Sequence, residues 1–191
     1  RSAFQLHVCR ADDVSISDFT LANHRGTEWS LSDAADSKLV VVAFLGTECP
    51  LAKLYGPRLT ELQMKYEGRG VAFVGINSNT QDSLTEIAAY VTRHKISFPM
   101  LKDVGNRVAD LFAAERTPEV FLLDENRNIR YRGRIDDQYL VGLSRDKVRR
   151  QDLALAIDEL LNQKDVSVPQ TEPIGCHIGR VQKTAASGDV T

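Results

Sequence analysis

The chain has 191 residues, of which 42% are hydrophobic and 26% are charged, a balance typical of a globular protein with one domain of ordinary size. Its formal net charge of -2 argues against nucleic acid or an anionic membrane as the main partner. The longest apolar run, Leu39–Leu45, is far shorter than a membrane span. We therefore expect no nucleic-acid partner and no membrane insertion.

The chain begins with Arg1 rather than Met, so we expect a processed or trimmed product. It contains three cysteines, Cys9, Cys49 and Cys176, and this odd number leaves at least one thiol unpaired within the chain. Neither a C-x-x-C pair nor a cluster of Cys and His residues occurs in the sequence. We therefore expect no disulfide framework, no structural metal and no cofactor.

The first half of the chain predicts a hairpin followed by a β-α-β unit. Alternating apolar residues around the turn sequence NHRG predict the hairpin within residues 14–31. The apolar runs at residues 39–45 and 71–77 predict two buried strands. Between them, an apolar stripe with helical spacing predicts a helix from about residue 50 to residue 67.

The second half predicts further helices and a second pair of strands. Helices are expected at residues 82–95, 106–114 and 146–161, with a short extended segment at residues 98–101. Residues 119–123 and 129–135 predict antiparallel strands joined by the turn sequence DENRN. This order predicts an α/β domain over residues 1–163, with a mixed sheet between helices. Residues 164–191, which lack such patterns, predict a C-terminal strap or linker that carries Cys176.

Cys49 is the first candidate for chemistry, because it follows a predicted buried strand and begins a predicted helix. The free N–H groups and the positive dipole end of a helix favour a thiolate at this position, and Lys53 one turn later would add to the effect. We therefore expect the Cys49 sulfur to be exposed and activated as a nucleophile. The alternative is that Cys49 is a small buried hydrophobic residue.

The segment around Cys49 resembles the active-site region of the thioredoxin superfamily. Cys49 matches the nucleophilic first cysteine, five residues after Phe44, and Lys53 matches the basic residue that follows the second cysteine. Thr117-Pro118, before the strand sequence EVFLL, resembles the Thr–cis-Pro motif that packs across from the nucleophile. The resemblance implies a thioredoxin-like three-layer α/β/α sandwich with a mixed sheet and an N-terminal hairpin.

Within that superfamily the chain is most similar to the redoxin branch, which contains AhpC/TSA (peroxiredoxin-like) and TlpA-like thiol-disulfide proteins. The resemblance rests on the motifs TECPLAK, GINSN, TPEVFLLD, GRIDDQY and GCxIGR, which here are Thr47–Lys53, Gly75–Asn79, Thr117–Asp124, Gly133–Tyr139 and Gly175–Arg180. It implies an extracytoplasmic, exported redox domain. Its implied partners are protein thiols and disulfides or small thiol and peroxide substrates, and an adjoining cytochrome c-like module.

Two departures from the family patterns limit the chemistry. Ala52 replaces the second cysteine of thioredoxin, so a local C-x-x-C disulfide is impossible. The peroxiredoxin signature is also broken, because Val42 replaces its proline and Gly46 replaces the hydroxyl residue that orients peroxide; Thr47 lies one position away. A high peroxidase rate is therefore not expected.

A nucleophile without a neighbouring cysteine needs a second thiol to complete the cycle. Cys176, on the predicted strap, is the first candidate for this resolving thiol, and an external thiol or a packing role for Cys176 are alternatives. Cys49, Cys176 and His177 would also make a sulfur and nitrogen set suited to Cu(I), although His177 is more often an ordinary surface residue. Cys9 has no motif around it and is interpreted as structural or incidental.

Charged residues near the motifs have less specific interpretations. Glu48 would raise the pKa of the neighbouring Cys49 thiol. Asp136-Asp137 is interpreted as a charged turn, with proton acceptance or partner recognition as the alternative. Arg132 or Arg134 would supply a cation to the thiolate, although arginines on a hairpin are more often solvated.

Three functions follow from these features. The first is an exported thiol-disulfide oxidoreductase in which Cys49 attacks, Cys176 or an external thiol resolves, and Thr117, Pro118 and Lys53 shape the site. The second is a slow peroxidase that uses the same Cys49. The third is a module without catalysis, either a redox sensor, a copper carrier or a tether for an electron-transfer partner.

Overall fold

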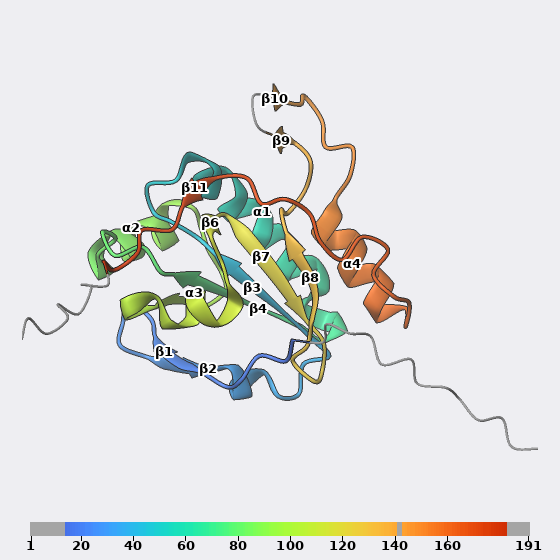
Figure 1. Cartoon of the computed structure of the whole chain (residues 1–191), viewed down its shortest axis with the longest axis horizontal. Helices are drawn as coiled ribbons and strands as arrows, with labels where there is room; N and C mark the ends of the chain where they lie inside the picture. The colour runs from blue at the N-terminus through green and yellow to red at the C-terminus, as the bar shows by residue number, and fades with distance from the viewer. Residues whose placement is uncertain (1–13, 141–142, 183–191) are drawn as a thin grey trace, which may run out of the picture.

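A five-stranded mixed sheet forms the centre of the computed structural model, which describes residues 14–140 and 143–182 (Figure 1). In spatial order the strands are β5 (Met100–Lys102), β4 (Val71–Asn77), β3 (Leu39–Phe44), β7 (Glu119–Leu123) and β8 (Ile129–Gly133). β3, β4 and β5 are parallel, whereas β7 is antiparallel to both β3 and β8. β3 is buried along its whole length because its sequence, LVVVAF, is apolar on both faces.

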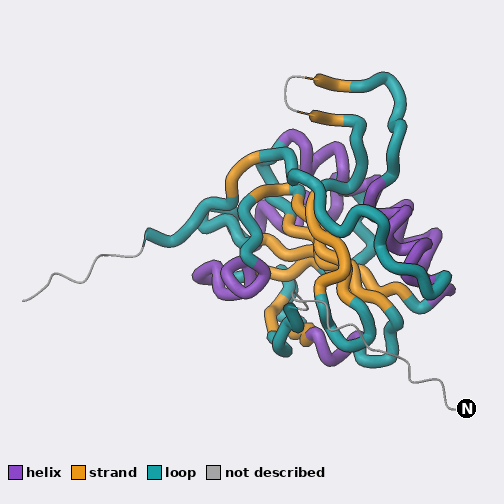
Figure 2. Tube along the Cα trace, turned by 45° about the vertical axis from the view of Figure 1, so that its right-hand side comes forward, coloured by secondary structure: helices purple, strands orange, loops and turns teal. Residues whose placement is uncertain are grey.

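Hydrophobic cores lie on both faces of this sheet. Side chains of β3 alternate between them: Val41 and Ala43 belong to one core, and Val42 and Phe44 belong to the other. Four helices supply residues to these cores: α1 (Pro50–Tyr66), α2 (Leu84–Arg93), α3 (Arg107–Phe112) and α4 (Asp152–Leu161). α1, α2 and α4 cover the first core, and α3 with the N-terminal hairpin covers the second. The predicted three-layer sandwich is therefore confirmed, as Figure 2 shows from a second direction.

The predicted N-terminal hairpin is also present. β1 (Thr20–Ala22) pairs antiparallel with β2 (Glu28–Ser30). The Asn23 side chain accepts hydrogen bonds from the backbone N–H groups of Arg25 at 2.8 Å and Thr27 at 3.0 Å, which closes the turn. A short 3₁₀ turn, η1 (Leu31–Ala34), follows the hairpin. Similar turns follow α1 and precede α3, namely η2 (Glu67–Arg69) and η3 (Val104–Asn106).

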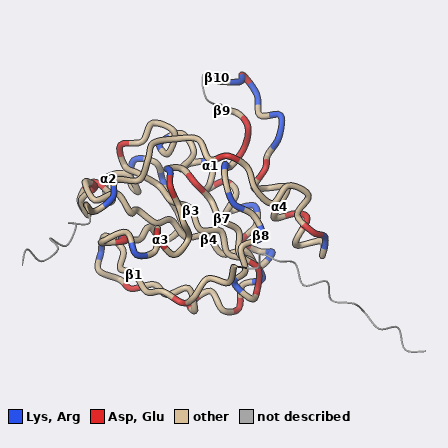
Figure 3. The backbone as a smooth tube through the Cα atoms, in the orientation of Figure 1, with Lys and Arg blue, Asp and Glu red and all other residues tan. Residues whose placement is uncertain are grey.

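The segment before α4 differs from the prediction. β9 (Tyr139–Leu140) and β10 (Leu143–Ser144) pair antiparallel on an arm that projects from the domain, and α4 begins at Asp152 rather than at residue 146. The Asp137 carboxylate accepts the backbone N–H groups of Arg149 at 2.8 Å and Arg150 at 2.9 Å. These bonds hold the backbone in an irregular connection, along which basic residues gather (Figure 3). The strand predicted at residues 129–135 likewise ends earlier, at Gly133.

The described part of the strap, residues 164–182, runs back across the domain and is hydrogen-bonded to it. Thr171 N–H donates to the Arg132 carbonyl at 3.0 Å beside β8. Farther along, β11 (Cys176–His177) pairs antiparallel with β6 (Arg116–Thr117), and Ile178 enters the second core. Within the described ranges, no helix combines the length and the apolar character needed to cross a membrane.

Candidate active site

Cys49 is the N-cap residue of α1, and Pro50 occupies the first helical position, where its missing N–H costs nothing. The loop that carries Cys49 leaves the C-terminal end of β3, so the central strand fixes the start of the helix. Tyr90 of α2 donates to the Ala52 carbonyl at 2.7 Å and steadies the first turn. The sequence therefore placed Cys49 correctly at the junction of a strand and a helix.

The expectation that the Cys49 sulfur is exposed is wrong, because Cys49 is only 4% exposed. Its thiol donates to the Thr117 carbonyl at 2.8 Å, and the Thr117–Pro118 peptide bond is cis. Thr117 in turn is paired with Cys176 through the β6–β11 ladder. The strap therefore lies over Cys49, which no local pattern around this residue predicts.

The surroundings of Cys49 favour its thiolate despite this burial. Burial raises the pKa of the Cys49 thiol, but hydrogen bonds from the Cys176 N–H, the Ala52 N–H, the Thr117 hydroxyl and the Cys176 thiol outweigh it. The pKa therefore lies below its ordinary value. Ala52 contributes as part of the first turn of α1, where N–H groups lack partners within the helix.

The Thr117 hydroxyl has a distinct position in this site. Thr117 is 1% exposed, and within residues 14–140 and 143–182 its hydroxyl has no hydrogen-bond partner while Cys49 is a thiol. It nevertheless lies close enough to Cys49 to lower the pKa of that thiol. Because a thiolate accepts hydrogen bonds more strongly than a thiol, the Thr117 hydroxyl favours the ionised form of Cys49.

The fold brings Cys176 next to Cys49, as a role of Cys176 as resolving thiol would require. Cys176 is exposed, and both cysteines are free thiols. Partial desolvation, followed by the hydrogen bond to Cys49 and its charge, raises the pKa of Cys176 to about 11, against a smaller opposing effect of Arg116. The two thiols therefore differ in character: Cys49 is the one that loses its proton first as the pH rises.

Lys53 does not point its charge at Cys49. Its ammonium group forms an ion pair with Glu48 at 3.1 Å, so these two charges offset each other beside Cys49. A cavity of about 220 Å³ opens at this place and is lined by Thr47, Glu48, Lys53, Glu86, Ala89, Tyr90, Arg93 and His94. Burial and the nearby Arg93 and Lys53 cations lower the pKa of His94.

The two hairpin arginines also have other partners. Arg132 pairs with the fully buried Glu119 at 3.1 Å, and Arg134 pairs with Asp152 at 2.7 Å. Glu119 accepts the backbone N–H groups of Glu115 and Arg116 with its other oxygen, at 2.8 and 3.2 Å. Glu119 therefore organises the segment before Pro118, and the two ion pairs occupy the guanidinium groups of Arg132 and Arg134.

A buried polar network beside Cys49 was missed by the sequence interpretation. Asp82 is 3% exposed and accepts hydrogen bonds from Thr47 N–H at 2.9 Å, the Asn77 amide at 2.6 Å and the Asn79 amide at 3.1 Å. Burial raises the pKa of Asp82, but these bonds outweigh it and lower the pKa overall. The motif GINSN followed by an aspartate was the available signal.

This network also reaches the strap. The Asn79 side-chain oxygen accepts the Gly179 N–H at 2.9 Å, and Thr80 N–H donates to the Gly179 carbonyl at 3.1 Å. The Lys102 ammonium group donates to Asn77 at 3.1 Å and to the Asp82 carbonyl at 2.8 Å. One set of hydrogen bonds therefore connects the loop before Cys49 with the segment that carries Cys176.

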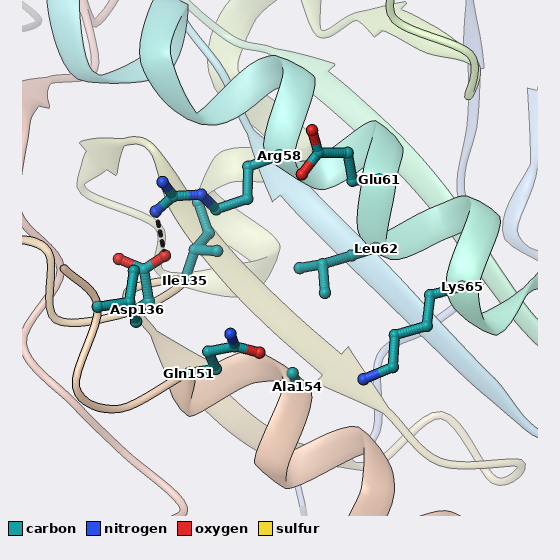
Figure 4. A pocket seen from close by; sticks show the side chains of 9 residues that line it. Arg58, Glu61, Leu62, Lys65, Ile135, Asp136, Gln151 and Ala154 are labelled. Carbon is teal, nitrogen blue, oxygen red and sulfur yellow. Dashed lines mark hydrogen bonds and ion pairs between the residues drawn. The ribbon is translucent and has the colours of Figure 1, made fainter.

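Asp136 and Asp137 do not form the solvated charged turn that the sequence predicted, since they are 2% and 7% exposed. Tyr55 donates to Asp136 at 2.6 Å, and Arg58 pairs with the same carboxylate (Figure 4). These partners, on α1, are about eighty positions away in the sequence. A cavity of about 340 Å³ adjoins this pair, and its lining residues are Arg58, Glu61, Leu62, Lys65, Ile135, Asp136, Val148, Gln151 and Ala154.

The copper hypothesis gains no support from the described residues, among which no group of three or more His, Cys, Asp or Glu side chains is placed to hold a metal. Cys176 and His177 are consecutive on β11, so their side chains point to opposite faces of the ladder. His177 is therefore directed away from the two thiols. Cys9 lies outside the described residues.

Comparisons with known proteins show the family and the fold of this chain. The AhpC/TSA family model matches residues 14–132. A relative named thiol-disulfide oxidoreductase ResA, from Halalkalibacterium halodurans, is 29% identical over 122 residues, covering 64% of this chain and 67% of that protein. Other ResA relatives are covered over 63% of their length, so the chain spans about two thirds of these proteins or slightly less.

Solved structures show the same architecture over more of the chain. A hypothetical protein from Sinorhizobium meliloti 1021 is 34% identical, with a TM-score of 0.83 over 91% of this chain and 97% of that chain. The thioredoxin domain of a thiol-disulfide oxidoreductase from Bacteroides vulgatus is 15% identical, with a TM-score of 0.60 over 80% and 99%. The fold is thioredoxin-like, and the chain belongs to the AhpC/TSA family.

Proposed function

We propose that this chain is a thiol-disulfide oxidoreductase in which Cys49 is the nucleophile and Cys176 is the resolving thiol. The observation that carries the proposal is the pairing of two free thiols of opposite character at one site. The pKa of Cys49 lies below its ordinary value, and that of Cys176 is raised to about 11. The ResA relatives, named as thiol-disulfide oxidoreductases, support the same activity.

The reaction begins with a disulfide substrate. Once the strap that covers Cys49 moves aside, the Cys49 thiolate attacks one sulfur of the substrate, forms a mixed disulfide and expels the other half as a thiolate. During this step the N–H groups of Ala52 and Cys176 and the Thr117 hydroxyl hold the Cys49 thiolate in position. Pro118, in the cis bond after Thr117, fixes the Thr117 carbonyl against the Cys49 thiol before the proton leaves.

Resolution uses the thiol on the strap. Cys176 gives its proton to the departing sulfur or to solvent, and its sulfur then attacks Cys49 in the mixed disulfide. The Cys49–Cys176 bond forms, and the second half of the substrate leaves as a thiol. Two electrons pass from the two protein thiols to the substrate disulfide. We further propose protein disulfides as substrates, a cytochrome c-like module as a partner and an extracytoplasmic location, which rest on the family resemblance.

Trapping each intermediate tests this sequence of steps. Reduced protein is mixed with hydroxyethyl disulfide, quenched in acid, blocked with N-ethylmaleimide and digested for mass spectrometry. The wild type is expected to yield a Cys49–Cys176 disulfide, and Cys176→Ser is expected to accumulate the adduct on Cys49. Cys9→Ser serves as the matched control and should behave as the wild type. An unchanged turnover rate in Cys176→Ser, or an adduct-free Cys49 in that variant, would contradict the proposal.

A further inference from the structure

The two sulfurs of the site differ sharply in their access to a partner. Cys49 is 4% exposed, whereas Cys176 is an exposed residue on the outer strand of the β6–β11 ladder. The Thr117 carbonyl contacts the Cys49 sulfur from one side, and the Cys176 backbone N–H lies against the same sulfur. A macromolecule that approaches this face of the protein therefore meets Cys176 first.

The strap is fixed in this covering position by hydrogen bonds on both sides of Cys176. On the N-terminal side of Cys176, Arg116 donates to the Gly175 carbonyl at 2.9 Å. On its C-terminal side, the Ile178 N–H donates to the Glu115 carbonyl at 2.9 Å, and the Gly179 N–H donates to the Asn79 side chain at 2.9 Å. Gly175 makes the close approach possible, because a Cβ there would overlap the Thr117 carbonyl. The cover is therefore built into the fold on both flanks of the exposed thiol.

From this geometry we infer that the reductant of the oxidised enzyme attacks Cys176, so that the external mixed disulfide forms on the strap and not on Cys49. The inference rests on the proposed function, because it starts from the Cys49–Cys176 disulfide. The partner is a dithiol protein or a small thiol. Its thiolate forms a bond to the Cys176 sulfur, the Cys49–Cys176 bond breaks, and both electrons of that bond leave with Cys49. A second partner thiol then releases Cys176 and takes the partner away as a disulfide.

The chemistry of the leaving group favours the same direction. Attack at Cys176 expels Cys49, whose thiolate is received by the N–H groups of Ala52 and Cys176 and by the Thr117 hydroxyl. Attack at Cys49 would instead expel Cys176, whose pKa is raised in the first place by desolvation. A thiol of lower pKa leaves faster in disulfide exchange, so the stability of the leaving group also favours attack at Cys176. The exposure of Cys176 and the stability of Cys49 as leaving group therefore both favour attack at Cys176.

One experiment distinguishes the two directions of attack. The oxidised full chain is first shown by mass spectrometry to contain the Cys49–Cys176 disulfide, and is then treated with glutathione at neutral pH. Early samples are quenched in acid and blocked with N-ethylmaleimide. The expected product carries glutathione on Cys176 and N-ethylmaleimide on Cys49, in roughly tenfold excess over the reverse product. An excess of glutathione on Cys49 would overturn the inference and leave the proposed function intact.

A control separates failure of this inference from failure of the proposed function. If the oxidised chain contains no Cys49–Cys176 disulfide, the proposed function is overturned and the inference falls with it. Gly68→Ala, where a Cβ meets no atom within 4 Å, should give the wild-type ratio of products. In Gly175→Ala, where the strap must shift, the excess of adduct on Cys176 is expected to fall below the wild-type excess, because Cys49 becomes more accessible. An unchanged ratio in Gly175→Ala would contradict the covering role of the strap.

Discussion

Replacing Thr117 with valine tests how the buried thiolate is stabilised. Valine has nearly the shape of threonine and suits a strand, so Thr117→Val removes the hydroxyl and keeps the packing of β6. The hydroxyl has no hydrogen-bond partner among the described residues when Cys49 is a thiol, and it stabilises the Cys49 thiolate. The substitution therefore destabilises the thiolate form of Cys49 and leaves the thiol form without a lost hydrogen bond.

The size of the effect follows from the free energy of a hydrogen bond to a charged group. Such a bond contributes about 1.5 to 3 kcal/mol, and one pKa unit corresponds to about 1.4 kcal/mol. Because the Cys176 and Ala52 N–H groups remain, we expect the pKa of Cys49 to rise by about one unit. At low pH, where Cys49 is a thiol, the variant should be at least as stable as the wild type, since a buried hydroxyl without a partner is removed.

The sign of the pH dependence follows from linkage. The folded state lowers the pKa of Cys49, so the thiolate stabilises the fold at high pH, and this contribution is lost as the pH falls through the folded pKa. Thr117→Val should reduce this gain in stability, while Thr117→Ser, which retains a hydroxyl, should preserve it. The assay is the rate of iodoacetamide labelling of Cys49 against pH, normalised to its plateau. An identical midpoint in the valine and serine variants would refute the reasoning.

The remaining predictions concern the strap and the buried network. Gly175→Ala should raise the plateau rate of Cys49 alkylation in the reduced protein by about tenfold, because the strap no longer covers the sulfur and its reactivity depends on access. Gly68→Ala should leave this rate unchanged. Equal alkylation rates in the two variants would contradict the covering role of the strap. Asp82→Asn should lower the free energy of unfolding by about 2 to 4 kcal/mol, since its carboxylate accepts three buried donors. Urea denaturation checks this value, with the exposed Asp36→Asn as control; a loss no larger than that of the control would contradict it. Because Asp82 has a lowered pKa, its contribution should be present at neutral pH and vanish as the pH falls through the folded pKa.

Much of the fold was predictable because local patterns decide it. The run LVVVAFL predicts the central strand because both faces of that strand are buried, and the sequence TECP places Cys49 at the start of α1. The start of α4 was not predictable in this way. It depends on the Asp137 carboxylate, which binds backbone N–H groups more than ten residues later and prevents the helical pattern from beginning at residue 146.

The candidate site was likewise predictable where local patterns decide it and not where distant contacts do. Cys49, the Thr117–Pro118 pair and Cys176 all had sequence signals. The burial of Cys49 had none, because its surroundings include the first hydrophobic core, Thr117 and a strap that is held by Asn79 and Glu115 about sixty to one hundred positions away. The same reason explains Asp136, whose charge looks solvated in the sequence and is buried by Tyr55 and Arg58.

The central claim is that the negative charge of the reduced site resides on Cys49 while Cys176 keeps its proton. A titration of carbon-13-labelled cysteine followed by NMR measures this directly, because the Cβ chemical shift of each cysteine reports its own ionisation regardless of access. We expect Cys49 to titrate below the value of an ordinary thiol and Cys176 near 11. A Cys176 that ionises first, or a Cys49 that stays protonated above the ordinary thiol value, would contradict the account.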